Sequence, residues 1–129
     1  TAPHTHRATS RFLLDIQAIP AIKDNSCLPI ISDPSHACFW HKWVRPLSLA
    51  SLAAGAEGLM LEIHPDPRNA AVDPLQAINL NEFSELVNKL KEVAKVLDKK
   101  IVFENLYTGY ESEIYRYPVE EYNRDIIIK

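Results

Sequence analysis

Two short apolar runs, each followed at once by acidic residues, histidine and proline, constrain the fold of this chain more than any other feature. The first run covers residues 28–31 and precedes Asp33, Pro34 and His36, and the second covers residues 58–63 and precedes the segment 64–67. Between them, residues 47–56 are rich in alanine and have the spacing of a helix. Buried strands that alternate with helices predict parallel strand pairing in βαβ units, and therefore an α/β fold.

The remaining pattern predicts further elements around this unit. Residues 12–22 have helical spacing that Pro20 ends or kinks, residues 35–43 form a loop, and Pro46 opens the alanine-rich helix, with Gly55 as its stop. Asn79 and Glu82 match a capping box at the start of the clearest helix. Its apolar stripe consists of Phe83, Leu86, Val87, Leu90, Val93, Ala94 and Leu97. Residues 101–103 and 126–128 predict two more strands.

Composition restricts the class of protein. The chain has 129 residues, 47% hydrophobic and 24% charged, with a formal net charge of −3, which is typical of one folded domain and gives no electrostatic footprint for nucleic acid. No apolar run is long enough to span a bilayer, so we expect no membrane partner. The chain has only three glycines, too few for a glycine-rich phosphate-binding loop. Its two cysteines are too few for a disulfide scaffold, so we expect reduced thiols and a cytoplasmic location.

Polar residues at the ends of the two predicted strands define a candidate site. The carboxyl ends of neighbouring parallel strands meet at one edge, so His36, Glu62 and Asp73 can converge there. One imidazole and two carboxylates suit a divalent metal such as Mn, Fe, Co or Zn, which can act as a Lewis acid on a carbonyl. In the alternative interpretation, His36 is a polar rim residue, Glu62 pairs with a nearby base and Asp73 forms a turn.

The same segments carry a family resemblance. LPIISDPSHA (residues 28–37), ASLAAGAEGLMLEIHPDP (residues 50–67), Asp73 and Gln76 closely resemble the C-terminal part of type Iβ 3-deoxy-7-phosphoheptulonate (DAHP) synthases. The resemblance begins at ATSRFLLDIQAIP (residues 8–20) and continues to about residue 99. The related 3-deoxy-8-phosphooctulonate synthases share the metal scheme but match the surrounding sequence less well.

The resemblance implies a fold and a reaction. It implies that residues 1–100 are about the last three βα units of a (β/α)₈ TIM barrel, incomplete in this chain, and that residues 101–129 are an extension of unknown role. The family condenses phosphoenolpyruvate with erythrose 4-phosphate in an aldol-like step, the first of the shikimate route to aromatic amino acids. The enol carbon of phosphoenolpyruvate attacks the aldehyde carbonyl of the sugar phosphate, and phosphate is then lost.

The resemblance also implies site residues. It assigns three metal ligands to His36, Glu62 and Asp73, whereas the fourth ligand of the family is a cysteine of the first barrel strand, which neither Cys27 nor Cys38 matches. Substrate-binding candidates are Arg11, Lys42 and Arg45. In place of the usual segment of the Gly-Arg-Arg type, this chain has CFWHKWVRP (residues 38–46), in which Lys42 and Arg45 only partly replace the family's positive charges.

These implications leave alternatives open. Because the phosphoenolpyruvate-binding Lys and Arg residues of the family fall outside this chain, we expect the 129 residues alone to be inactive. The chain would then either pair with a missing N-terminal half or be a non-catalytic remnant that self-associates as a homo-oligomer and so covers its open sheet edges. A third alternative is a 3-deoxy-8-phosphooctulonate synthase-like activity.

Overall fold

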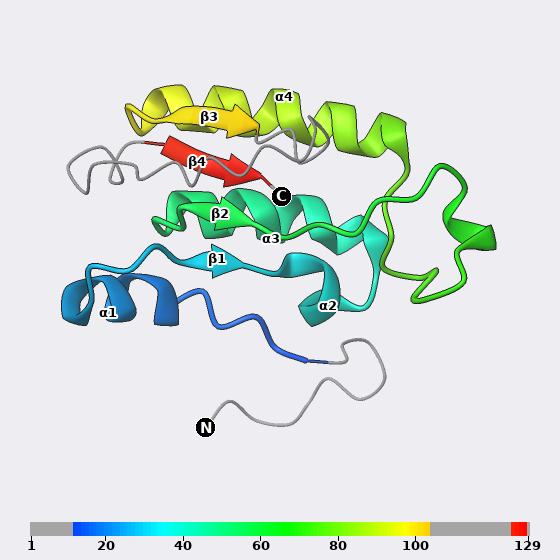
Figure 1. The fold of residues 1–129 in the computed structure, drawn as a ribbon, viewed down its shortest axis with the longest axis horizontal. Helices are drawn as coiled ribbons and strands as arrows, with labels where there is room; N and C mark the ends of the chain where they lie inside the picture. Colours follow the sequence, from blue (N-terminus) through cyan, green and yellow to red (C-terminus); the bar gives the residue numbers. More distant parts are fainter. Residues whose placement is uncertain (1–11, 104–124, 129) are drawn as a thin grey trace, which may run out of the picture.

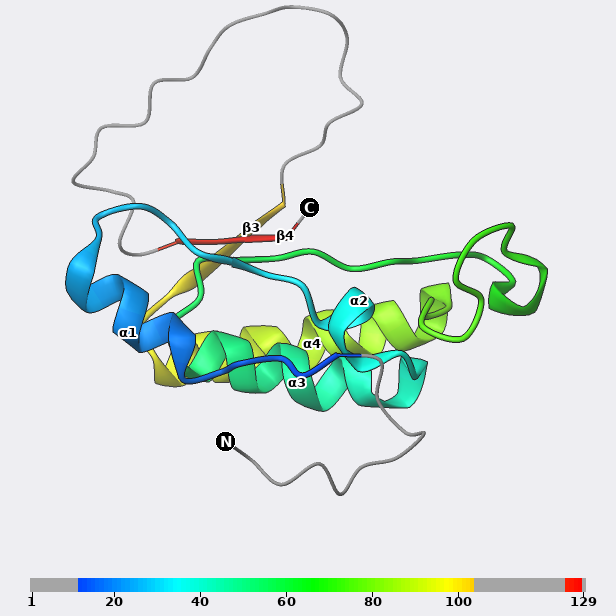
Figure 2. The same ribbon diagram turned by 90° about the horizontal axis from the view of Figure 1, so that it is seen from below.

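The computed structural model describes residues 12–103 and 125–128, and these residues form one parallel sheet with its helices on one side (Figures 1 and 2). The elements in chain order are α1 (Ala18–Asn25), β1 (Ile31–Ser32), α2 (Pro34–Cys38), α3 (His41–Ala53), β2 (Gly58–Leu59), the 3₁₀ turn η1 (Pro67–Asn69), α4 (Leu80–Val96), β3 (Lys100–Phe103) and β4 (Asp125–Ile128).

All strand pairs of the described sheet are parallel, as the alternation of apolar runs and helices predicts. The strand order is β1-β2-β4-β3, and β1 pairs with β2 through Ile31–Gly58 and Ser32–Leu59. The two predicted strands near the end of the chain are confirmed as parts of β3 and β4, and β4 lies between β2 and β3. The segment that we expected to be a separate extension therefore contributes strands to the same sheet, while its division from residues 1–100 stays a prediction.

The core lies between this sheet and the two long helices, α3 and α4 (Figure 2). It is formed by side chains that are at most 3% exposed: Cys38, Val44, Leu52, Leu59, Ile78, Leu86, Leu90 and Ala94. The stripe predicted on α4 is confirmed, because its residues are either buried or pack against this cluster. The opposite side of the strands carries Ile31 and Met60, which are 49% and 46% exposed. The helices thus cover one face of the sheet and leave these apolar side chains on the other.

The first helix begins later than the sequence predicts. It starts at Ala18 rather than at residue 12 and continues to Asn25, and the Asp15 carboxylate accepts a hydrogen bond from Ala18 N at 3.1 Å. Pro20 is the third residue of α1 and does not end the helix, because N–H groups in the first turn have no intrahelical partner to lose.

The segment predicted as a loop over residues 35–43 is mostly helical. Asp33 caps α2 by accepting a hydrogen bond from His36 N at 3.1 Å, and Pro34 takes the first helical position. Phe39, with a left-handed φ of 68°, ends α2 before α3 starts. The capping pattern D-P-x-x therefore produces a short helix directly after β1.

Pro46 lies inside α3 rather than at its first position, which corrects our prediction. A proline there removes one backbone hydrogen bond, but α3 buries Val44 and Leu52 completely against the core, and this packing holds the helix together. The predicted stop is confirmed: α3 ends at Ala53, and Gly55 follows with a φ of 107°.

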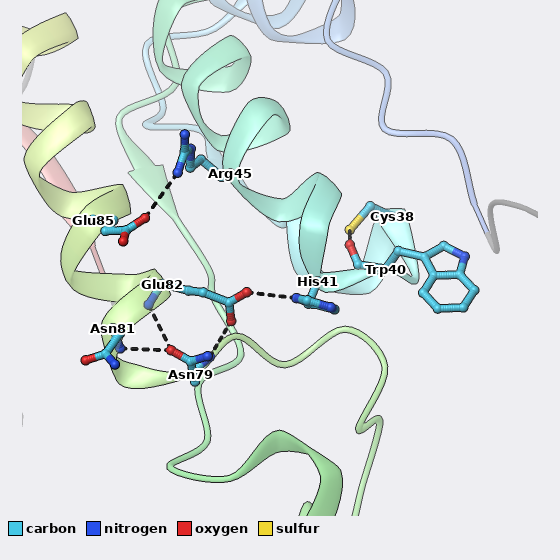
Figure 3. A network of polar contacts seen from close by, with 8 residues as sticks. All are labelled: Cys38, Trp40, His41, Arg45, Asn79, Asn81, Glu82 and Glu85. Atoms are coloured by element: carbon cyan, nitrogen blue, oxygen red, sulfur yellow. Dashed lines mark hydrogen bonds and ion pairs between the residues drawn. The ribbon is translucent and has the colours of Figure 1, made fainter.

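The predicted capping box at the start of α4 is confirmed (Figure 3). Asn79 Oδ1 accepts hydrogen bonds from Asn81 N and Glu82 N, both at 2.9 Å, and Glu82 Oε2 accepts one from Asn79 N at 2.9 Å. These contacts satisfy N–H groups that the helix itself cannot. No helix in the described part of the chain, α4 included, is both long and apolar enough to cross a membrane.

Replacing Asn79 by alanine should lower the free energy of unfolding by about 1 kcal/mol, because the first turn of α4 loses its side-chain acceptor. The control is Asn88→Ala, on the exposed side of the same helix, which should leave the stability unchanged or raise it slightly, since alanine is the better helix former. Urea unfolding followed by far-ultraviolet circular dichroism measures both. Equal stability of the Asn79→Ala variant and the wild type would contradict the role of the cap.

Candidate metal centre

The chains that follow β1 and β2 stay hydrogen-bonded beyond the two-residue ladder. Met60 N donates to Ser32 O at 2.8 Å, and Glu62 N donates to the hydroxyl oxygen of Ser35 at 3.0 Å. Ser35 is fully buried, so this contact is shielded from water. The strand-end segments therefore run together as far as Glu62.

A third segment, residues 73–78, closes on the other side of Glu62. Ile78 N donates to Glu62 O, and His64 N donates to Ile78 O, both at 3.0 Å. Both backbone polar groups of Glu62 are thus paired, one with each neighbouring segment. Asp73 comes just before the turn in this segment. Its φ of 47° is left-handed, a conformation that aspartate tolerates better than most residues.

This arrangement brings the three predicted metal ligands together. One donor atom from each of His36, Glu62 and Asp73 lies within 4.8 Å of the other two, and His36 Nε2 is 3.7 Å from Glu62 Oε2. The side chains of His36 and Glu62 are 52% and 25% exposed, so the group is open on one side. One nitrogen and two carboxylate donors suit the divalent metals expected from the sequence. The residues present therefore fit a metal ion.

The imidazole of His36 is held by Asp33, which lies three residues earlier in the chain and outside the donor group. His36 Nδ1 is 2.8 Å from Asp33 Oδ2, while the other carboxylate oxygen caps the backbone of the same histidine. A carboxylate only accepts hydrogen bonds, so Nδ1 carries a proton, and in the neutral imidazole Nε2, on the side of Glu62, is then the nitrogen with the lone pair. A hydrogen bond of this kind is typical of metal-binding histidines. The spacing of Asp33 and His36, three positions apart, is the sequence signal for this contact.

A second contact that we did not predict fixes the carboxylate of Glu62. Gln76 Nε2 donates to Glu62 Oε2 at 2.7 Å, and Gln76 is only 1% exposed. In the sequence, Gln76 stands only as part of the family pattern, and nothing in its spacing connects it with Glu62, 14 residues earlier.

Neither described cysteine belongs to the three-donor group. Cys27 is exposed and precedes β1, and so lies at the opposite end of that strand from His36. Cys38 is buried, and its thiol donates to the carbonyl of Trp40 at 3.2 Å. Burial raises the pKa of the Cys38 thiol above its usual value, which disfavours the thiolate that a metal would need. Cys38 is therefore a structural residue.

Two of the predicted substrate-binding residues, Lys42 and Arg45, lie on α3 and are already engaged. The Lys42 ammonium lies over the rings of Trp40 and Trp43, at 5.8 and 5.9 Å from their centroids. Arg45 forms a 3.3 Å ion pair with Glu85 of α4 (Figure 3). The third, Arg11, lies outside the described residues. The substrate-binding role of all three stays a prediction.

His41 begins α3 and does not join the metal ligands. Its Nδ1 forms a 2.9 Å contact with Glu82 Oε1, which ties the start of α3 to the capping box of α4 (Figure 3). The imidazole is 46% exposed. His41 is therefore a surface residue with a local structural partner.

Fold and site together define a class of protein: a parallel α/β chain whose candidate metal centre lies at the carboxyl ends of two neighbouring strands, where such folds carry their active sites. Residues 3–99 match the DAHP synthetase I family, and the chain belongs to that family.

Individual relatives agree with this assignment. The chain is 41% identical over 97 residues to a phospho-2-dehydro-3-deoxyheptonate aldolase of Thermotoga maritima, covering 75% of this chain and 29% of that protein. It is 31% identical over 101 residues to a 2-dehydro-3-deoxyphosphooctonate aldolase of Desulfotalea psychrophila, covering 70% of this chain and 36% of that protein. The chain thus spans about a third of the length of these relatives.

Solved structures show the same similarity. The crystal structure of the phospho-2-dehydro-3-deoxyheptonate aldolase (DAHP synthase) from Thermotoga maritima superposes with a TM-score of 0.69 at 41% identity, covering 73% of this chain and 28% of that one. A truncated form of 3-deoxy-D-arabino-heptulosonate 7-phosphate synthase from the same organism gives a TM-score of 0.69 at 43% identity, covering 72% and 35%.

The two cysteines should differ sharply in reactivity. A thiol-alkylating reagent at neutral pH should add one group to the folded protein, at the exposed Cys27, because burial protects Cys38 and keeps it protonated. Intact-mass spectrometry counts the adducts, with a Cys27→Ser variant as the control that should stay unmodified until it is unfolded. Rapid addition of two groups to the folded protein would contradict the structural role of Cys38.

Proposed function

We propose that this chain forms part of the metal centre of a DAHP synthase, an enzyme that joins phosphoenolpyruvate to erythrose 4-phosphate in an aldol-like condensation. The observation that carries the proposal is the convergence of His36, Glu62 and Asp73, within 4.8 Å of one another, in a chain of the DAHP synthetase I family. The three residues come from three separate segments and meet at the carboxyl ends of β1 and β2, which a purely structural role would not require.

The proposal includes the architecture around the site. The described sheet would be part of a (β/α)₈ barrel, in which helices cover the outer face of the strands and side chains of the other face fill the interior. The helices of this chain cover one face of the sheet (Figure 2). Ile31 and Met60 are exposed and alternate with the buried Ser32 and Leu59, so their side chains on the other face suit such an interior. Completing the barrel would require strands beyond those described, from this protein or from a partner chain.

Within this enzyme, His36, Glu62 and Asp73 would hold a divalent cation. When bound, the cation supplies Lewis-acid polarisation of the aldehyde carbonyl of the sugar phosphate. Asp33 accepts the hydrogen bond of the protonated Nδ1 of His36, which leaves Nε2 as the nitrogen that would bind the cation. Glu62 N donates to Ser35 Oγ and Ile78 N donates to Glu62 O, and these two hydrogen bonds hold the backbone of Glu62 in place. Because the donors are held by such contacts, the site would need little rearrangement on binding its metal.

A second candidate differs in the sugar acceptor. The similarity to the octonate aldolase of Desulfotalea psychrophila favours a 3-deoxy-8-phosphooctulonate synthase-like activity, in which a different aldehyde would use the same metal centre. The higher identity to the heptonate aldolase of Thermotoga maritima makes the DAHP synthase activity our preferred proposal. An eight-carbon product needs an acceptor with one carbon more than a seven-carbon product does. Comparing erythrose 4-phosphate with a five-carbon aldose phosphate as acceptor, in the protein combined with further strands of a barrel, therefore distinguishes the two. Our expectation that the 129 residues alone are inactive stays a prediction.

Removing a metal ligand should weaken metal binding at least about tenfold, since even residues that only support a ligand have effects of that size. We expect this loss in His36→Ala and in Glu62→Ala when the metal-free protein is titrated with Mn²⁺ in a calorimeter. His41→Ala is the matched control, because this exposed histidine lies outside the donor group, and its affinity should stay that of the wild type.

Circular dichroism of each variant separates lost ligands from lost fold. Equal Mn²⁺ affinity in the wild type, His36→Ala and Glu62→Ala would refute the ligand assignment. Absence of binding in the folded wild type would refute the proposed metal function of the isolated chain.

A further inference from the structure

One buried residue contacts two of the three proposed metal ligands. Gln76 lies in the turn between Asp73 and the strand-like segment at Ile78, and only 1% of its surface is exposed. Its side chain reaches Glu62, and its backbone reaches Asp73. We infer that Gln76 is a positioning residue that fixes Glu62 and Asp73 relative to each other. This inference rests on the proposed metal function.

The side-chain contact orients the Glu62 carboxylate. Gln76 Nε2 donates to Glu62 Oε2 at 2.7 Å, and the same oxygen is the one that faces His36 Nε2 at 3.7 Å. The terminal torsion of a glutamate is broad, so a free carboxylate would sample many orientations. A short hydrogen bond from a buried amide selects one of them and leaves the other lone pairs of the carboxylate for a cation.

The backbone contact orients the segment that carries Asp73. Gln76 N donates to Asp73 O at 3.1 Å and closes the turn in which Asp73 has its left-handed φ of 47°. The two contacts start from the same residue, so a shift of the turn would move Asp73 and the Glu62 carboxylate together. Gln76 thus fixes the positions of Glu62 and Asp73 relative to each other, although the two residues are 11 positions apart in the sequence.

The chemistry of the amide suits this task better than a charged group would. A lysine at this position would compete with the metal for the Glu62 carboxylate, and an acidic side chain would repel that carboxylate. A neutral amide donates one hydrogen bond and adds no charge to the site. Its burial next to Glu62 makes the hydrogen bond stronger than it would be in water.

The test replaces the amide by an apolar group of similar size. In Gln76→Met the donor to Glu62 is lost, whereas the backbone hydrogen bond to Asp73 remains. The matched control is Gln17→Met, the same change at an exposed position before α1. Each metal-free protein is titrated with Co²⁺, whose visible absorption reports both affinity and coordination, and thermal unfolding is measured without metal.

We expect Gln76→Met to bind Co²⁺ about 10–100-fold more weakly than the wild type and, at saturation, to show a changed visible spectrum. Gln17→Met should match the wild type in both. A purely structural role would lower the melting temperature without changing the spectrum of the saturated protein, and that result would overturn the inference.

The remaining outcomes are also decisive. If the wild type binds Co²⁺ and Gln76→Met binds it equally well with the same spectrum, the positioning role is wrong while the proposed metal function stands. If the folded wild type binds no Co²⁺, the proposed metal function itself fails. If Gln76→Met does not fold, Gln76→Leu takes its place, and a loss of fold in both would make Gln76 a core residue and overturn the inference.

Discussion

The site depends on the parallel alignment of β1 and β2 and on its continuation past the ladder. The contacts Met60 N–Ser32 O, at 2.8 Å, and Glu62 N–Ser35 Oγ, at 3.0 Å, join residues that are 28 and 27 positions apart in the chain. α3 connects the two strands and buries Val44 and Leu52 against the core beneath them. Without this alignment a histidine from one strand end and a glutamate from the next would not face each other at 3.7 Å.

Much of the fold could be predicted because its signals are local. The capping box of Asn79 and Glu82 and the stripe that follows depend on residues a few positions apart, and α4 forms as expected. The segment at residues 34–46 differs from the prediction for two reasons: α2 follows a local signal, the cap at Asp33 and Pro34, that the predicted loop left out, whereas at Pro46 tertiary packing decides. Pro46 favours the start of a helix by its local preferences, yet α3 extends through it since the face of this helix packs on the sheet and on α4.

The same distinction applies to the candidate site. The convergence of His36, Glu62 and Asp73 could be predicted from one general rule, that residues after neighbouring parallel strands meet at one edge. The contacts that orient them follow from no such rule. Asp33 is only three positions from His36, so its contact corresponds to a spacing that is visible in the sequence. Gln76 reaches Glu62 only because the intervening loop folds back beside the strand. The contacts that orient the candidate ligands therefore need the structure, even though the meeting of these residues could be predicted without it.

The convergence of His36, Glu62 and Asp73 on one cation is tested most directly by crystals of the protein soaked in Mn²⁺, with an anomalous difference map recorded near the manganese absorption edge. Our account predicts one strong peak between the three side chains, about 2.0–2.3 Å from His36 Nε2 and from a carboxylate oxygen of each acid. A well-ordered site without a peak, or a peak bound by other residues while these three point apart, would contradict it.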